Sequence, residues 1–227
     1  MLTYRVLSRL LSYPNAEMVA GVGEMRAVLA GEGLVSSRDR QALEPLLTDL
    51  ESKELLDLQE RYVLLFDRSR SLSLHLFEHV HGESRDRGQA MVNLGELYAE
   101  HGLEVSDREL PDYLPLFLEF LSLLPPREAA ELLAEPAHVV DALHRRLLKR
   151  ESCYAGVFGT LLGLAAGKPD DEALTALLQE PDTDPEDREA LDRAWEETAV
   201  TFGPDPNAGC PQTRDLLARM APPPARS

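Results

Sequence analysis

Two histidines and a glutamate stand close together in the pattern His75-x-x-Glu78-His79. On a helix, residues four apart share one face, so both imidazoles could bind a single zinc ion. Glu78 could then activate a metal-bound water, as in the inverted zinc metallopeptidases. The pattern is short, and a third ligand would have to come from another element. We favour two histidines on a partly buried helix face, hydrogen-bonded to neighbouring carboxylates, and keep a zinc metallopeptidase as an alternative.

The residues that follow extend this cluster with charges of both signs. Glu83 and Arg87 are four apart, with the acid before the base, which is the favourable order on a helix. Gly82 supplies the backbone freedom for a turn between two helices. The cluster is either a solvated network of ion pairs or a recognition surface, and the sequence leaves both interpretations open.

Signatures of other enzyme classes are missing from the sequence. It contains no Gly-x-Ser-x-Gly, no phosphate-binding P-loop and no Gly-x-Gly-x-x-Gly after a strand. Cys153 and Cys210 are 57 residues apart and lack the spacing of a zinc site. Two distant thiols fit a reducing compartment. We therefore predict no catalytic residues and no metal site.

The charge balance excludes some classes of partner. The chain of 227 residues has 23 Lys and Arg against 40 Asp and Glu, a net charge of −17. A nucleic-acid-binding protein needs clustered basic residues, and so does a protein that docks on anionic lipid. The longest uncharged run, residues 152–167, is 16 residues and thus too short for a membrane span of about 20. The N-terminus lacks the features of a signal peptide, so we expect a cytoplasmic protein.

Apolar residues recur at helical spacing along most of the chain, and no hairpin signal interrupts them. Asn15 and Ser36 are expected to cap helices, the latter through a Ser36-x-x-Asp39 capping box. Residues 111–124 are apolar on nearly all sides, which predicts a central helix with Pro111 in its first turn. The fold class predicted from this pattern is an all-α, multi-helix bundle in a single domain.

The composition changes near residue 168. Residues 170–197 contain 12 Asp and Glu and 2 Arg, a net charge of −10. Proline and glycine become frequent after residue 201. We predict a helical core over residues 1–167, an acidic helical extension over 168–201, and a Pro/Gly-rich, mostly disordered tail over 202–227.

Four segments resemble a known family. The segment Leu76–Met91 (LFEHVHGESRDRGQAM) is similar to the signature of the NarJ family, the molybdenum cofactor assembly chaperones of respiratory nitrate reductase. Leu10–Pro14, Glu60–Asp67 and Glu109–Leu121 agree with further motifs of that family. Tyr113 stands where the broader TorD/DmsD group usually has histidine, as expected for the nitrate reductase branch. The resemblance covers roughly residues 1–165.

The resemblance implies a non-catalytic, cytoplasmic chaperone with the all-α fold of the TorD/NarJ-like type. Such a protein binds the N-terminal segment of the catalytic α subunit of nitrate reductase in its apo form. It assists insertion of the molybdenum cofactor, carries no cofactor of its own, and delays membrane attachment until the subunit is mature. We expect a monomer without nucleic-acid partners or membrane insertion. A generic helical adaptor that binds through residues 170–197 remains another alternative.

The resemblance also suggests which residues form the peptide-binding groove. The acidic charge would steer a basic peptide, and an apolar groove would bind its amphipathic helix. Phe66 and Phe117 could equally belong to the plain core. The predicted groove residues are Tyr62, Phe66, His75, Glu78, His79, Glu83, Arg87, Asp112, Tyr113 and Phe117.

Overall fold

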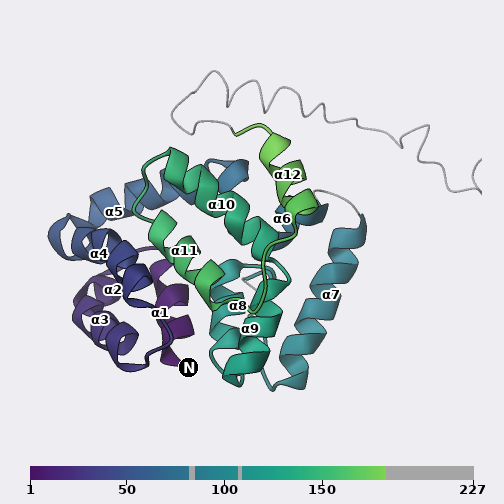
Figure 1. Cartoon of the computed structure of the whole chain (residues 1–227), viewed down its shortest axis with the longest axis horizontal. Coiled ribbons are helices and arrows are strands. Elements are labelled where there is room, and N and C mark those ends of the chain that lie inside the picture. The colour runs from purple at the N-terminus through teal and green to yellow at the C-terminus, as the bar shows by residue number, and fades with distance from the viewer. Residues whose placement is uncertain (82–84, 107–108, 183–227) are drawn as a thin grey trace, which may run out of the picture. The chain divides into compact units, whose positions relative to one another are not determined.

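The structure is a computed structural model, and it describes residues 1–81, 85–106 and 109–182 (Figure 1). Within these ranges the chain has twelve α-helices, a π-helical turn, a 3-10 turn and no strand, which confirms the all-α prediction. The predicted tail and most of the predicted acidic extension lie outside the described residues. The helices are α1 (Leu2–Leu10), α2 (Ala16–Ala20), α3 (Val22–Gly31), α4 (Ser37–Ser52), α5 (Leu55–Tyr62), α6 (Leu76–His81), α7 (Arg85–Glu100), α8 (Leu114–Leu121), α9 (Pro126–Ala134), α10 (Ala137–Lys149), α11 (Ala155–Leu164) and α12 (Asp171–Gln179).

The predicted helix caps are present. The Asn15 side chain accepts a hydrogen bond from the Met18 N–H at the start of α2. At α4, the Ser36 hydroxyl accepts from the Asp39 N–H, and it donates to the Asp39 carboxylate at 2.6 Å. Each cap satisfies an N–H group that has no partner within its helix, so the sequence determines where these helices begin.

The predicted start of the central helix is wrong. Helix α8 begins at Leu114 rather than at Pro111, because the residues before it pair with a distant segment instead. The Leu76 N–H donates to the carbonyl of Asp112, and the Leu114 N–H donates to the carbonyl of Leu74. These two bonds flank an isolated antiparallel bridge between His75 and Tyr113. Long-range backbone pairing therefore replaces the first predicted helical turn.

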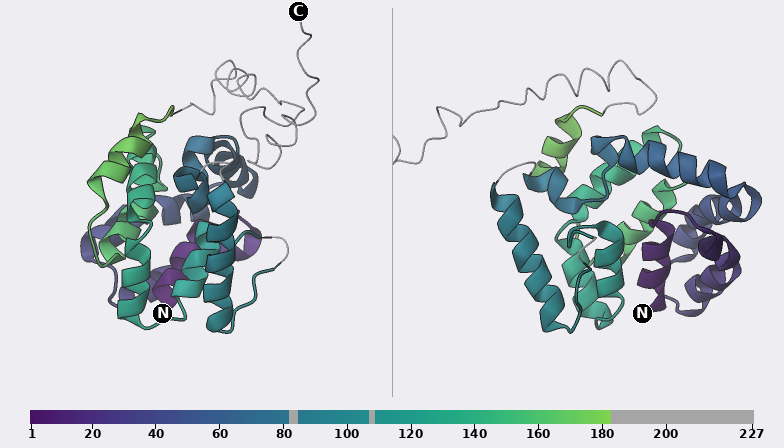
Figure 2. Two further views of the ribbon diagram at one scale, coloured as in Figure 1. Left: turned by 90° about the vertical axis from the view of Figure 1, so that its right-hand side faces the viewer. Right: turned by 180° about the vertical axis from the view of Figure 1, so that it is seen from behind.

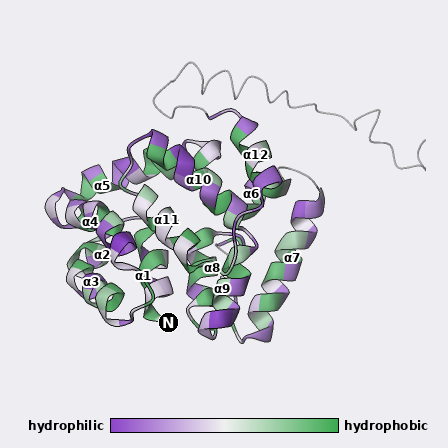
Figure 3. Cartoon of the chain, in the orientation of Figure 1, coloured by the Kyte–Doolittle hydropathy of each residue, from purple (hydrophilic) through white to green (hydrophobic). Residues whose placement is uncertain are grey.

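Helix α8 lies within the core and packs along α1. The side chains of Leu114, Leu118 and Leu121 are fully buried. Figure 3 shows hydrophobic residues along most of α8, whereas the outer helices carry more hydrophilic ones. The chain buries this apolar surface because each helix contributes one apolar face to a shared core.

Helix α11 packs closely against both α4 and α10. A Cβ atom at Gly156 would lie 2.1 Å from the carbonyl oxygen of Ala42, so only glycine allows the backbones of α11 and α4 to approach so closely. Helix α12 packs on α10 through buried Leu174 and Leu177.

Helix α7 lies at the edge of the helical assembly, where Figure 2 shows it from two further sides. At its C-terminal end, the buried Tyr98 ring packs on Phe120 with ring centroids 4.7 Å apart. The Tyr98 hydroxyl donates to the carbonyl of Pro111 at 2.8 Å. Among the described helices, none is both long and apolar enough to cross a lipid bilayer.

Candidate functional site

Asp112 is the centre of a hydrogen-bond network between two of the motif segments. Its side chain is fully buried, and its Oδ1 atom lies 3.1 Å from Nδ1 of His75. Its Oδ2 atom accepts a hydrogen bond from the Phe77 N–H, also at 3.1 Å. A buried carboxylate needs such donors, because losing water without replacement partners is costly. Asp112 therefore fixes the start of α6 against the residues that precede α8.

His75 lies just before α6 and is half-buried. The hydrogen bond to Asp112 raises the pKa of His75, although burial opposes this effect. The imidazole ring also packs beside the Tyr113 ring, with centroids 5.4 Å apart. His75 is thus a polar group of defined orientation, whose protonated form is favoured by a buried negative charge.

His79 has a different environment. It is 8% exposed, and its Nε2 atom lies 2.8 Å from the carbonyl oxygen of Ser73. Burial lowers the pKa of His79, which favours the neutral ring with the proton on Nε2. The prediction that both histidines share one helix face and bind carboxylates is therefore wrong: His75 precedes the helix, and His79 binds a backbone carbonyl.

The His75-x-x-Glu78-His79 pattern of the zinc metallopeptidase alternative does not form a shared metal site. The Nδ1 atom of His75 and the Nε2 atom of His79 are directed at separate partners, Asp112 and the Ser73 carbonyl. In the described ranges, no group of three His, Cys, Asp or Glu side chains is placed to hold a metal ion.

An ion pair joins α6 to α7. Nη2 of Arg87 lies 3.2 Å from the Glu78 carboxylate and 4.0 Å from Oδ2 of Asp112. Both charged side chains are partly buried, so water screens this pair less than a surface pair. Glu83, the partner of Arg87 expected from spacing, lies outside the described residues.

An aromatic cleft of about 280 Å³ lies beside this network. The Tyr62 hydroxyl donates to the carbonyl of Leu11 at 2.8 Å, so the hydroxyl of Tyr113, 3.1 Å away, donates to Tyr62. The Tyr62 ring packs on Phe66 with centroids 5.0 Å apart. The hydrogen bond between Tyr62 and Tyr113 and the ring contact between Tyr62 and Phe66 together orient the aromatic rings around the cleft. The cleft is lined by Tyr13, Tyr62, Phe66, Asp67, Leu74, His75 and Tyr113.

The cleft unites four of the predicted groove residues. Tyr62, Phe66, His75 and Tyr113 line it directly. Asp112, Glu78 and Arg87 form the supporting network behind His75. His79 and Phe117 do not line it: His79 faces Ser73, and Phe117 lies in the hydrophobic core of α8.

Sequence reasoning missed three residues of the cleft, Tyr13, Asp67 and Leu74. Tyr13 belongs to the motif Leu10–Pro14, and Asp67 ends the motif Glu60–Asp67. Their place in these motifs was the signal that could have identified them. Leu74 stands outside the quoted motifs, and its role follows only from its backbone pairing with Leu114.

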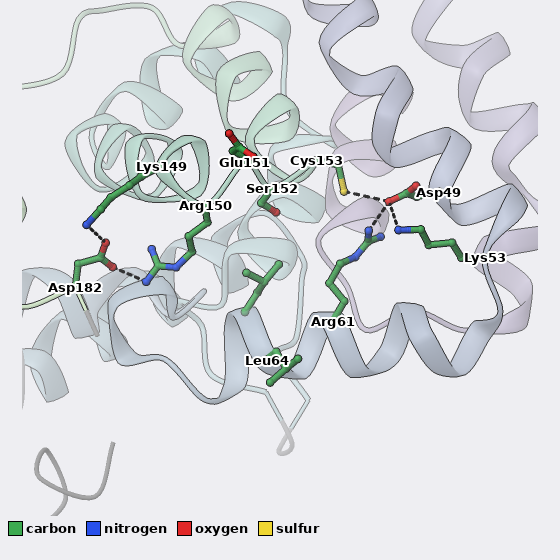
Figure 4. A pocket seen from close by; sticks show the side chains of 11 residues that line it. Asp49, Lys53, Arg61, Leu64, Lys149, Arg150, Glu151, Ser152, Cys153 and Asp182 are labelled. Atoms are coloured by element: carbon green, nitrogen blue, oxygen red, sulfur yellow. Dashed lines mark hydrogen bonds and ion pairs between the residues drawn. The ribbon is translucent and has the colours of Figure 1, made fainter. Parts of the chain in front are cut away.

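A larger cavity of about 680 Å³ lies between other elements, and Figure 4 shows its lining side chains. Asp49 pairs there with Arg61 and Lys53, and Asp182 pairs with Arg150 and Lys149. Four basic and three acidic side chains line the cavity, which leaves a net charge of +1. Burial raises the pKa of the Cys153 thiol, which disfavours a nucleophilic thiolate. None of the predicted groove residues lines this cavity.

Comparison with known proteins places the chain in a family. The family model of the nitrate reductase delta subunit matches residues 32–159. The nitrate reductase molybdenum cofactor assembly chaperone NarJ of Escherichia coli (strain K12) is 44% identical over 209 residues, which are 92% of this chain and 88% of that protein. The probable nitrate reductase molybdenum cofactor assembly chaperone NarW of the same strain is 45% identical over 170 residues, 73% of each chain.

A more distant relative agrees with these two. The probable nitrate reductase molybdenum cofactor assembly chaperone NarJ of Bacillus subtilis (strain 168) is 33% identical over 164 residues, 71% of this chain and 86% of that protein. All three relatives are named as assembly chaperones and not as enzymes. The family match includes three of the four motif segments. The chain is therefore a non-enzymatic member of the nitrate reductase delta subunit family, and the resemblance to the NarJ chaperones is confirmed.

Proposed function

We propose that this chain is a cytoplasmic chaperone for the catalytic α subunit of a respiratory nitrate reductase. It binds the N-terminal segment of the apo subunit while the molybdenum cofactor is inserted, and it delays membrane attachment until insertion is complete. The chain acts as a monomer and carries no cofactor of its own. Its family membership supports the chaperone role, since the relatives are named for molybdenum cofactor assembly.

One observation supports the choice of site: the aromatic cleft lies beside the Asp112 network. Three of the motifs that carry the family resemblance contribute side chains to the cleft, and a fourth supports it from α6. A short segment that is unfolded when free can bind with apolar side chains in such a cleft, and its folding costs part of the affinity. Moderate affinity suits a partner that must be released after maturation.

Calorimetry with the α subunit's N-terminal peptide tests the site. Tyr13 is suitable for substitution because it lines the cleft and is 47% exposed, so Tyr13→Ala should leave the core intact. We expect it to weaken binding about tenfold, as for an aromatic anchor. The control is Leu123→Ala, which removes a 58% exposed side chain that does not line the cleft.

The outcomes separate the function from the site. If the unmodified chain does not bind the peptide, the proposed function is wrong. If the chain binds but Tyr13→Ala and Leu123→Ala behave alike, the cleft is not the binding site.

A second experiment tests the cellular role. Nitrate-respiring cells that lack this chain should place cofactor-free α subunit at the membrane, as fractionation and molybdenum analysis would show. Pull-down from cells unable to make the cofactor should recover the apo α subunit with the chain. Normal cofactor content of the α subunit in cells without the chain would contradict the proposal.

A further inference from the structure

Asp67 is the only carboxylate among the residues that line the aromatic cleft. It ends the π-helical turn of residues 63–67, which continues α5, and its side chain lines the aromatic cleft. Across the described part of the chain, no hydrogen bond or ion pair engages its carboxylate. Asp67 is exposed, and partial desolvation raises the pKa of its carboxyl group with no partner to lower it.

The walls around Asp67 are aromatic. Its charge acts on both Tyr62 and Tyr113, raising the pKa of each in addition to the larger effect of burial. Aromatic ring faces carry partial negative charge and attract cations, most strongly where water is excluded. A carboxylate beside several aromatic rings is therefore an environment for a positive group.

The other charged residues around the cleft also favour a positively charged ligand group. His75 lines the cleft and Arg87 belongs to the network behind it, and both have carboxylate partners of their own in Asp112 and Glu78. Glu109 adds a further negative influence on Tyr113. Among the residues that line the cleft, none is an ion-pair partner of Asp67.

The cleft is small for a complete ligand. Sites for whole small molecules span about 300 to 1,000 Å³, and this cleft of about 280 Å³ lies below that range. Its volume suits one long side chain that is anchored by a polypeptide outside.

We propose that the aromatic cleft takes one lysine or arginine side chain of the bound N-terminal segment, with Asp67 as its counter-ion. This inference rests on the proposed function for the identity of the peptide. Asp67 is then a specificity-determining residue, which rejects segments that offer a neutral or acidic side chain at that position.

A small probe tests the cleft without the peptide. We would titrate the full chain with n-butylguanidinium and, as a neutral control of the same shape, n-butylurea, following tyrosine ring signals by NMR. We expect n-butylguanidinium alone to shift the signals of Tyr62 and Tyr113, and Asp67→Asn to abolish that shift. Equal shifts from both probes would overturn the proposal.

A second experiment uses the N-terminal peptide of the α subunit. Each lysine and arginine of the N-terminal segment is replaced in turn by methionine, and every peptide is titrated against the parent chain, Asp67→Asn and Asp57→Asn. Asp57→Asn is the matched control, because it removes the same charge from an exposed position on α5.

We expect Asp67→Asn to weaken binding of the parent peptide about two- to fivefold, as for an exposed cation–π and ion-pair site. The loss should vanish for the one peptide that lacks the inserted side chain, which is the signature of direct coupling. If Asp67→Asn matches Asp57→Asn with every peptide, the proposal is wrong although the peptide still binds. If the parent peptide does not bind at all, the proposed function fails, and the n-butylguanidinium result still decides the chemistry of the cleft.

Discussion

The Nδ1 atom of His75 lies 3.1 Å from Oδ1 of Asp112, a residue 37 positions further along the chain. Asp112 belongs to the motif segment Glu109–Leu121, and His75 directly precedes the motif segment Leu76–Met91. Their hydrogen bond, with the backbone bonds on either side, aligns the start of α6 with the start of α8. The position of the cleft wall formed by His75 and Tyr113 therefore depends on this contact.

Removal of the Asp112 carboxylate should destabilise the fold. Asp112→Ala leaves His75 and the Phe77 N–H without their partner, and we expect a loss of about 3 kcal/mol in the free energy of unfolding. Urea denaturation followed by circular dichroism measures this loss. Asp57→Ala, at an exposed position, should change stability by less than about 0.5 kcal/mol. Equal midpoints for the two variants would contradict the role of Asp112.

The His75–Asp112 bond should make stability depend on pH. Because the folded-state pKa of His75 is raised, its contribution is full below the unfolded pKa of about 6.5 and is lost as pH rises through the folded value. The difference in stability between the parent and His75→Gln should shrink between about pH 5.5 and pH 9. Denaturation series at both pH values measure this difference in stability. A difference that grows with pH would contradict a raised folded-state pKa of His75.

His79 should act in the opposite direction. Burial lowers its folded-state pKa, so protonation favours the unfolded chain, and stability falls as pH drops below about 6.5. His79→Gln removes this titration and should reduce the loss of stability between about pH 7 and pH 5, at some cost in stability near neutrality. Thermal melting over this pH range provides the measurement. A steeper acid dependence in the variant would be incompatible with a neutral His79.

Gly156 should not tolerate a side chain. In Gly156→Ala the new Cβ atom would clash with the carbonyl of Ala42, and separating α11 from α4 should cost about 2 kcal/mol or more. Gly95 is the matched control, because a Cβ atom there meets nothing within 4 Å. Gly95→Ala should be neutral or stabilising by up to about 1 kcal/mol through helix propensity. Chemical denaturation of both variants tests the close approach of the two helices.

Two truncations test whether the acidic segment carries the binding. Ending the chain after Asp182 keeps α12. Ending it after Gly167 deletes α12, including Leu174 and Leu177, and exposes the surface of α10 on which this helix packs. The chain of residues 1–182 should retain most peptide affinity at moderate salt, with weaker binding only at low salt. Residues 1–167 should be less stable. Loss of peptide binding by the folded 1–182 chain would favour the adaptor alternative.

The sequence predicted what depends on neighbours along the chain. Caps such as Asn15 and Ser36 are local, because a side chain and the N–H it satisfies lie within three residues. The start of α8 could not be predicted, because the bond between Leu74 and Leu114 outweighs the helical preference of residues 111–113.

In the candidate site, too, the sequence predicts local features but not those that depend on long-range packing. Tyr62, Phe66, His75 and Tyr113 could be named from motifs, but periodicity does not show which side of each segment faces the cleft. Phe117 lies in the core instead, because α8 turns that side chain away from the cleft. Tyr13 joins the site only through the packing of its ring on Tyr62, at 5.6 Å between centroids. The domain boundaries at residues 167 and 201 stay predictions.

The hydroxyl of Tyr62 reaches backward to Leu11 and forward to Tyr113, each 51 positions away. The cleft is therefore incomplete in any fragment that lacks part of residues 11–113, and in a growing chain until residue 113 has emerged from the ribosome. Closing loops of this length costs entropy that only the completed core repays. Under the proposed function, recognition of the α subunit is thereby linked to folding of the chaperone itself, so an incomplete copy has no site at which to bind the subunit.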